Sequence, residues 1–157
     1  MSPAASYYAT VRWTGGHRGT VTLGNGPVLD FAPPPDAHGE VGVLTPEDAF
    51  VAAANTCVML MVLWAAERFK LRLLSYECRA EGQKTVALDR TETFSRLCFR
   101  PVLRVGAGDE APAVVEGRTR RALEAARKYS LVANSVTADI VVEPEIVIEP
   151  GAGGVGT

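Results

Sequence analysis

Cys57 is the residue of this sequence with the strongest claim to chemistry. It lies in a long apolar stretch, where a thiolate is disfavoured, so a reactive thiol there would require a nearby cation. Asn55 and Thr56 precede it, and buried polar side chains need partners. They indicate that this segment faces a cavity, a second subunit or a site. The alternative is that Cys57 is a small core residue packed as a hydrophobe.

Two charged residues could act together with Cys57. Glu47 lies ten residues earlier, which in one regular helix corresponds to roughly 15 Å of rise. Because that distance excludes direct contact, a long arginine side chain would have to lie between them. Arg18, which follows His17 in a glycine-rich turn, is a candidate for this cation. Both charges also have ordinary explanations, since acidic residues suit helix starts and polar residues suit hairpin tips.

The other two cysteines have simpler explanations. Cys78 alternates in phase with apolar neighbours, which predicts a core position. Cys98 shares its strand face with Arg96 and Arg100, which predicts either an oxidisable surface thiol or a small residue between two solvated arginines. No cysteine belongs to a CxxC pair or a Cys/His cluster. We therefore expect no metal site and no cofactor.

Composition narrows the class of protein. The chain has 157 residues, of which 47% are apolar and 22% charged, and this mixture predicts a single globular domain over 1–157 with a flexible glycine-rich tail at 151–157. A formal net charge of -2 gives no electrostatic reason to expect nucleic-acid or membrane binding. The start of the sequence lacks the features of a signal peptide. The odd number of cysteines favours a reducing cytoplasm.

Residues 45–69 carry a strong helix signal. Thr45 is a typical N-cap and Pro46 suits the first helical position. From Ala49 to Ala66 only two polar residues interrupt the apolar run, which approaches the roughly 17–25 residues of a bilayer span. Its alanines make the run weakly hydrophobic, and its neighbours predict strands. We therefore expect a helix surrounded by protein on all sides.

Strand patterns flank this helix on both sides. Alternating residues predict strands at 7–13, 20–23, 28–31, 73–81, 85–88, 94–105, 136–142 and 146–148. Pro101 predicts an edge strand or a bulge within its segment. A second, amphipathic helix is expected from Val114 to about Tyr129. Strands grouped around two helices predict an α+β fold.

Taken in order, these motifs resemble the OsmC/Ohr family of osmotically inducible and organic hydroperoxide resistance proteins. The resemblance covers roughly residues 8–149. Its most specific part is Pro46-Glu47 followed ten residues later by Cys57, and the turn at 13–19 and the segment 128–135 also fit. The resemblance implies antiparallel sheets wrapped around a long buried central helix in an intertwined homodimer. Such a dimer would explain a helix that is apolar all round in so small a protein.

The resemblance also implies a thiol-dependent peroxidase that reduces organic hydroperoxides. In this chemistry one cysteine thiolate attacks the peroxide and becomes a sulfenic acid, and a second cysteine then forms a disulfide with it. Carried over, Cys57 matches the attacking cysteine and Glu47 the glutamate that holds an activating arginine. By one alignment of the Gly-Gly turn the arginine position falls on His17, and by a one-residue shift it falls on Arg18. We favour Arg18, because it is charged at any pH.

Ser130 is the main departure from the family pattern, because it stands where the second cysteine is expected. A serine cannot form the disulfide. Oxidised Cys57 would then depend on an external thiol reductant, or on Cys78 or Cys98 if either came close. Two alternatives to a peroxidase are therefore open. One is a non-catalytic relative that binds a small molecule in an apolar interface pocket or senses redox state. The other is a dimer with a structural or protein-interaction role, in which Cys57 only packs.

Overall fold

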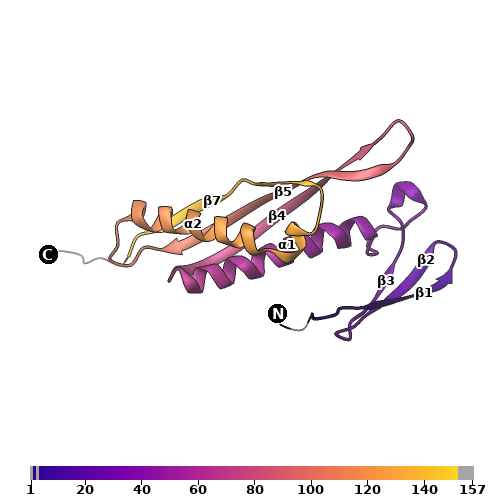
Figure 1. The fold of residues 1–157 in the computed structure, drawn as a ribbon, viewed down its shortest axis with the longest axis horizontal. Helices are drawn as coiled ribbons and strands as arrows, with labels where there is room; N and C mark the ends of the chain where they lie inside the picture. Colours follow the sequence, from indigo (N-terminus) through magenta and orange to yellow (C-terminus); the bar gives the residue numbers. More distant parts are fainter. Residues whose placement is uncertain (1, 3, 152–157) are drawn as a thin grey trace. The chain divides into compact units, whose positions relative to one another are not determined.

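The computed structural model describes residue 2 and residues 4–151, so most of the predicted flexible tail, at 152–157, lies outside the described residues. Figure 1 shows the order of the helices and strands along the chain. The chain divides into two units, the first ending at Phe50 and the second beginning at Val51. That the whole chain acts as one domain stays a prediction.

The first unit contains a three-stranded antiparallel sheet in the order β1-β2-β3. Its strands are β1 (Ala9–Gly15), β2 (Arg18–Leu23) and β3 (Val28–Phe31), close to the predicted bounds. The turn between β1 and β2 uses Gly15 and Gly16 at positive φ, which glycine adopts without steric cost. A 3-10 turn, η1 (Pro35–Ala37), follows the sheet.

The long helix α1 (Pro46–Arg68) begins where the sequence predicts. The backbone N–H of Asp48 donates to Thr45 Oγ1 at 3.0 Å, which is the expected N-cap bond. α1 begins in the first unit and continues into the second. In the second unit it lies close to the sheet, since a Cβ added to Gly82 would be 2.9 Å from Val51 Cγ2.

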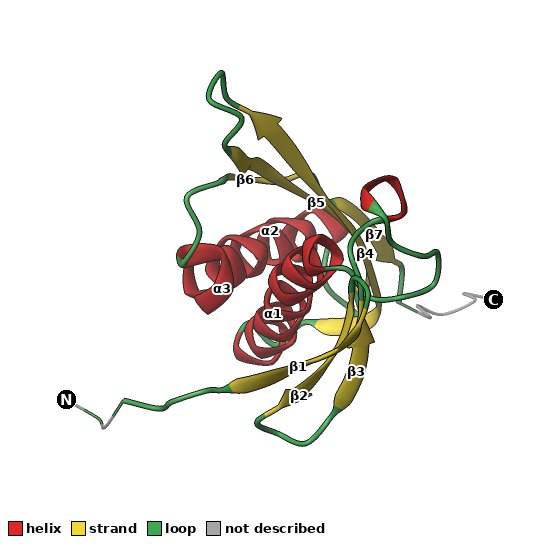
Figure 2. Cartoon of the chain, turned by 90° about the vertical axis from the view of Figure 1, so that its right-hand side faces the viewer, coloured by secondary structure: helices red, strands yellow, loops and turns green. Residues whose placement is uncertain are grey.

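The second unit is built on a long antiparallel hairpin formed by β4 (Arg72–Val86) and β5 (Glu92–Gly106). β4 joins the two strands that the sequence predicts separately, because only the residues from 87 onward leave the ladder for the turn. After β5 come α2 (Pro112–Tyr129) and the short α3 (Leu131–Asn134). Figure 2 shows α1 and α2 on the same face of the sheet.

The last two strands of the described part of the chain are β6 (Asp139–Val142) and β7 (Glu145–Glu149). Both pair with β5 in parallel. The structure confirms the α+β class, but its second sheet is mixed where antiparallel sheets were expected. The physical reason is the helical crossover: α2 returns the chain to the starting end of β5, so the next strands run in its direction.

Pro101 does not mark an edge strand, because β5 has neighbours on both sides. β6 pairs with the segment from Arg96 to Phe99, and β7 pairs from Val102 onward. Pro101 therefore faces the interruption between β6 and β7, where its missing N–H costs no ladder bond on that side.

In the single chain α1 is buried on one face, so its expected enclosure by protein on all sides, which the resemblance assigns to two chains, stays a prediction. One face is buried, and its buried residues are Ala54, Val58, Val62, Ala65 and Ala66. The opposite face leaves Leu60 56%, Leu63 38% and Trp64 39% exposed. α1 also has the length and hydropathy of a membrane span, but core helices of soluble proteins share both properties, so this is weak evidence.

Candidate functional site

Cys57 and Ser130 are in direct contact. Cys57 projects half-buried from α1, and the Ser130 hydroxyl donates a hydrogen bond to its Sγ across 3.3 Å. Ser130 itself is 0% exposed. The structure thus brings together the thiol and the residue that the sequence analysis aligned with a second cysteine.

Local structure explains why the Ser130 hydroxyl is available to Cys57. Ser130 separates α2 from α3 in an extended conformation, with φ -72 and ψ 109, and occupies the N-cap position of α3. Serine at this position commonly bonds to a backbone N–H of the helix it precedes. Here it makes no such capping bond, and its hydroxyl is directed to the thiol instead.

Cys57 belongs to a stripe of α1 that faces α2. Met61, Trp64 and Arg68 follow it at spacings of four, seven and eleven residues, which places all four on one side of a helix. The last three line a cavity of about 690 Å³, together with residues of α2 and the residue that follows α1. The main contributions of α2 are Glu124, Lys128 and Tyr129.

The cavity has aromatic walls and a surplus of positive charge. The rings of Trp64 and Tyr129 meet edge to face, with centroids 5.6 Å apart and an interplanar angle of 77°. The Arg68 guanidinium lies 5.7 Å from the centroid of Trp64, and the Lys128 ammonium lies 5.2 Å from that of Tyr129. Both distances suit cation–π contacts. The sequence analysis did not predict this cavity. The spacing of Met61, Trp64 and Arg68 along α1 indicates one of its walls.

A second, smaller cavity of about 160 Å³ lies on another side of α1, and Asn55 and Cys78 are among its lining residues. The Asn55 side-chain amide donates to the Cys78 carbonyl at 2.9 Å, which confirms that a polar residue of the apolar run has a partner. The Asn55 Oδ1 atom and the Tyr76 hydroxyl, also at this cavity, are buried, and Asn55 Oδ1 has no hydrogen-bond partner among the described residues. Burial raises the pKa of the Tyr76 phenol and the pKa of the Cys78 thiol.

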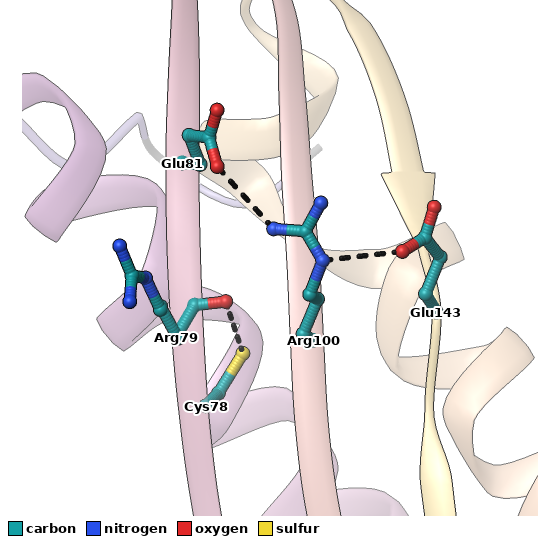
Figure 3. A network of polar contacts seen from close by, with 5 residues as sticks. All are labelled: Cys78, Arg79, Glu81, Arg100 and Glu143. Atoms are coloured by element: carbon teal, nitrogen blue, oxygen red, sulfur yellow. Dashed lines mark hydrogen bonds and ion pairs between the residues drawn. The ribbon is translucent and has the colours of Figure 1, made fainter.

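The structure corrects the expected settings of Cys78 and Cys98. Cys78 is half-exposed rather than in the core, and its thiol contacts the Arg79 carbonyl at 3.8 Å (Figure 3). Cys98 is only 2% exposed, so the surface-thiol reading is wrong. Its neighbour Arg100 remains exposed and pairs with Glu81 and Glu143, at 3.4 and 3.2 Å.

The charged residues predicted to activate Cys57 lie in the first unit. Arg18 Nη1 contacts both carboxylate oxygens of Glu40, at 3.1 and 3.2 Å. The His17 ring stacks on His38 with centroids 5.5 Å apart. Glu47 Oε2 is buried and has no hydrogen-bond partner among the residues that the structure describes. In this structure the partner of Arg18 is therefore Glu40 and not Glu47.

One protein-family model matches more than half of the chain. The model of the family described as OsmC-like protein matches residues 38–145. No curated protein matches the chain by sequence.

Several solved structures share the fold at low sequence identity. An OsmC-like protein of unknown function from Vibrio cholerae is 21% identical, with a TM-score of 0.79 over 90% of this chain and 99% of that chain. An organic hydroperoxide resistance protein from Elizabethkingia anophelis is 15% identical, with a TM-score of 0.70 over 95% and 100%. One from Bacillus subtilis is 18% identical, with a TM-score of 0.60 over 90% and 98%.

Proposed function

Because the chain belongs to the OsmC-like protein family, we propose that it is a thiol-dependent peroxidase that reduces organic hydroperoxides at Cys57. The observation that carries this proposal is the contact between the Cys57 thiol and the buried Ser130 hydroxyl. A hydrogen-bond donor directed at sulfur favours the thiolate, which is the nucleophile in peroxide reduction. The names of the similar proteins from Elizabethkingia anophelis and Bacillus subtilis support the same chemistry.

The proposed reaction begins with attack of the Cys57 thiolate on one peroxide oxygen. The O–O bond breaks, the sulfur gains that oxygen as a sulfenic acid, and the alkoxide leaves and takes up a proton to become an alcohol. Two electrons pass from sulfur to the peroxide, so regeneration requires two electrons from thiols outside the site.

We assign the activating cation to Arg18 and its carboxylate partner to Glu47. Glu47 Oε2 is buried and has no partner within the described part of the chain, which costs free energy unless a donor approaches it. The present partner of Arg18, Glu40, forms an exposed ion pair, and such pairs contribute about 0–1 kcal/mol. Loss of the Arg18–Glu40 pair would therefore cost little free energy.

We also assign a homodimer, in which a second copy covers the exposed face of α1. Leu60 and Leu63 lie on the exposed face of α1, and exposed apolar patches of this kind mark interfaces. We also infer a reducing cytoplasm as the compartment, from the odd number of cysteines and their lack of a CxxC pair or Cys/His cluster.

The direct test is oxidation of the reduced protein by one equivalent of cumene hydroperoxide. We expect one added oxygen, located on Cys57 by peptide mass spectrometry, and formation of one equivalent of the alcohol. Cys78→Ser should behave like the wild type, and Cys57→Ser should leave the peroxide intact. If Cys57 stayed reduced in the presence of stoichiometric peroxide, the peroxidase proposal would fail.

The cavity between α1 and α2 favours one alternative, a non-catalytic relative that binds a small apolar ligand or senses redox state. Its volume of about 690 Å³ and its aromatic walls, Trp64 and Tyr129, suit a small ligand. A binding protein would bind its ligand equally well after Cys57→Ser. A sensor would accumulate oxidised Cys57 and show no turnover when dithiothreitol is supplied.

A further inference from the structure

We propose that an external thiol carrying a carboxylate regenerates oxidised Cys57, and that it enters through the cavity between α1 and α2. This inference rests on the proposed peroxidase function and identifies the class of its second substrate.

No other thiol of the chain faces Cys57. The buried neighbour of its sulfur is the Ser130 hydroxyl, which cannot form a disulfide. Cys98 is 2% exposed within β5. Cys78 lines the smaller cavity next to Asn55, and Asn55 and Cys57 point about 160° apart around the axis of a regular helix. The electrons must therefore come from outside the chain.

The larger cavity lies close to the sulfur, although neither Cys57 nor Ser130 is among its lining residues. Met61, on its wall, lies one helical turn after Cys57 on the same side of α1. Tyr129, on the opposite wall, directly precedes Ser130 in the chain. One end of the cavity is therefore adjacent to the contact between Cys57 and Ser130.

The charged residues that line the cavity favour a thiol that carries a negative charge. Arg68 and Lys128 contribute two cations, and Glu124 contributes one carboxylate, so the lining is positive overall. Each cation lies over an aromatic ring, which holds it at the wall. A small thiol with a carboxylate complements this charge, whereas a thiol with an ammonium group is repelled.

The regeneration reaction balances with two such thiols. The first thiolate attacks the sulfur of the Cys57 sulfenic acid, an S–S bond forms, the S–O bond breaks, and the hydroxide takes up a proton and leaves as water. The second thiolate attacks the external sulfur of this mixed disulfide and releases the Cys57 thiolate. Two external thiols are thus oxidised to one disulfide for each peroxide reduced.

The test separates oxidation from regeneration in single-turnover experiments. The protein is first treated with one equivalent of cumene hydroperoxide, and the sulfenic acid is quantified with dimedone. The oxidised protein is then mixed with 3-mercaptopropionate, 2-mercaptoethanol or cysteamine. Formation of the mixed disulfide is followed by rapid-quench mixing and mass spectrometry. We expect the rate constant per thiolate to be roughly threefold to tenfold higher for mercaptopropionate than for cysteamine, with mercaptoethanol between them.

Variants link this preference to the cavity. Arg68→Gln and Lys128→Gln should each reduce the preference, and the double variant should abolish it. Arg121→Gln is the matched control, because Arg121 is an exposed cation of α2 that is not among the cavity-lining residues. High salt should weaken the preference in the wild type, since exposed charges are screened.

The results that would overturn this inference can be distinguished from the result that would overturn the proposed peroxidase function. If no sulfenic acid forms, the peroxidase proposal fails and the inference fails with it. If sulfenic acid forms but all three thiols react at one rate per thiolate, only the inference is overturned. The same holds if Arg68→Gln and Lys128→Gln slow the oxidation step alone, which would assign the cavity to the hydroperoxide. An intramolecular disulfide from Cys57 to Cys78 or Cys98 would also overturn it.

Discussion

The Ser130 hydroxyl lies 3.3 Å from the Cys57 sulfur, although 73 residues separate them in the sequence. The contact joins the middle of α1 to the junction between α2 and α3. It keeps a donor beside the thiol and at the same time fills the position from which an internal thiol could resolve a sulfenic acid. The chemistry of this pair is therefore the most informative property to test.

Replacing Ser130 by cysteine should create an internal disulfide with Cys57. The present separation of the Oγ and Sγ atoms is 3.3 Å, and a disulfide requires about 2.05 Å between sulfurs, so a shift of about 1 Å suffices. We expect Ser130→Cys to lose two titratable thiols on treatment with one equivalent of hydroperoxide, and to give a linked peptide pair by mass spectrometry. Ser135→Cys is the control. Persistence of free thiols in Ser130→Cys would contradict the observed contact.

Removing the Ser130 hydroxyl should slow the oxidation of Cys57. A hydrogen bond to a charged group contributes about 1.5–3 kcal/mol, and its loss raises the free energy of the thiolate. We expect Ser130→Ala to lower the second-order rate constant for cumene hydroperoxide by about tenfold, measured by competition with a reference peroxidase. Ser135→Ala is the matched control for Ser130→Ala, because the Ser135 hydroxyl donates to the Leu131 carbonyl and not to a thiol. Equal rates in the two variants would show that Ser130 only fills space.

Local signals in the sequence were sufficient for α1 and α2, and the family resemblance led to the pairing of Cys57 with Ser130. The N-cap at Thr45 and the apolar run fix α1, and the resemblance aligns Ser130 with a thiol-contacting position. The parallel pairing of β6 and β7 was not predictable in this way, because their partner strand lies across a helical crossover. For the same reason the position of Pro101 was misjudged.

Local sequence patterns also could not predict the cavity or the exposed face of α1. Met61, Trp64 and Arg68 show the spacing of a helix stripe, but nothing near them in sequence identifies Lys128 and Tyr129 as the opposite wall. Cys98 alternates with two arginines, which suggested solvent, yet it is buried in the strand that lies at the centre of the sheet. Burial here depends on which strands become neighbours, and that information is distributed over the whole chain.

A charge on the exposed face of α1 should prevent the proposed homodimer from forming. Leu60 is 56% exposed in the single chain, and burial of a leucine side chain at an interface contributes about 1.5–3 kcal/mol. Leu60→Glu would instead bury a carboxylate, so we expect a monomer by sedimentation velocity where the wild type is dimeric. Leu88→Glu is the control, since Leu88 is fully exposed in the turn between β4 and β5. A monomeric wild type would refute the dimer.

The stability of the protein should fall at alkaline pH because of Cys78 and Tyr76. Burial raises the pKa of both groups above their ordinary values of 9.0 and 10.0. The unfolded chain therefore releases these protons at a lower pH than the folded chain, and the free energy of unfolding decreases as pH rises above about 9. We expect Cys78→Ala combined with Tyr76→Phe to flatten this decrease between pH 8 and pH 10.5 in urea unfolding. If the free energy of unfolding decreased with pH as steeply in the double variant as in the wild type, groups other than Cys78 and Tyr76 would be responsible.

Arg18 has two candidate carboxylates, and their removal should have opposite effects on Cys57. If Arg18 activates the thiol when it pairs with Glu47, then Glu47→Gln should slow oxidation by cumene hydroperoxide, and Arg18→Gln should slow it at least as much. Glu40→Gln removes the exposed partner that Arg18 contacts in this structure, so oxidation should be unchanged or faster. His17→Gln tests the neighbouring position and should have little effect, because His17 stacks on His38. Slower oxidation in Glu40→Gln, with a normal rate in Glu47→Gln, would reverse the assignment and make Glu40 the residue that positions the arginine.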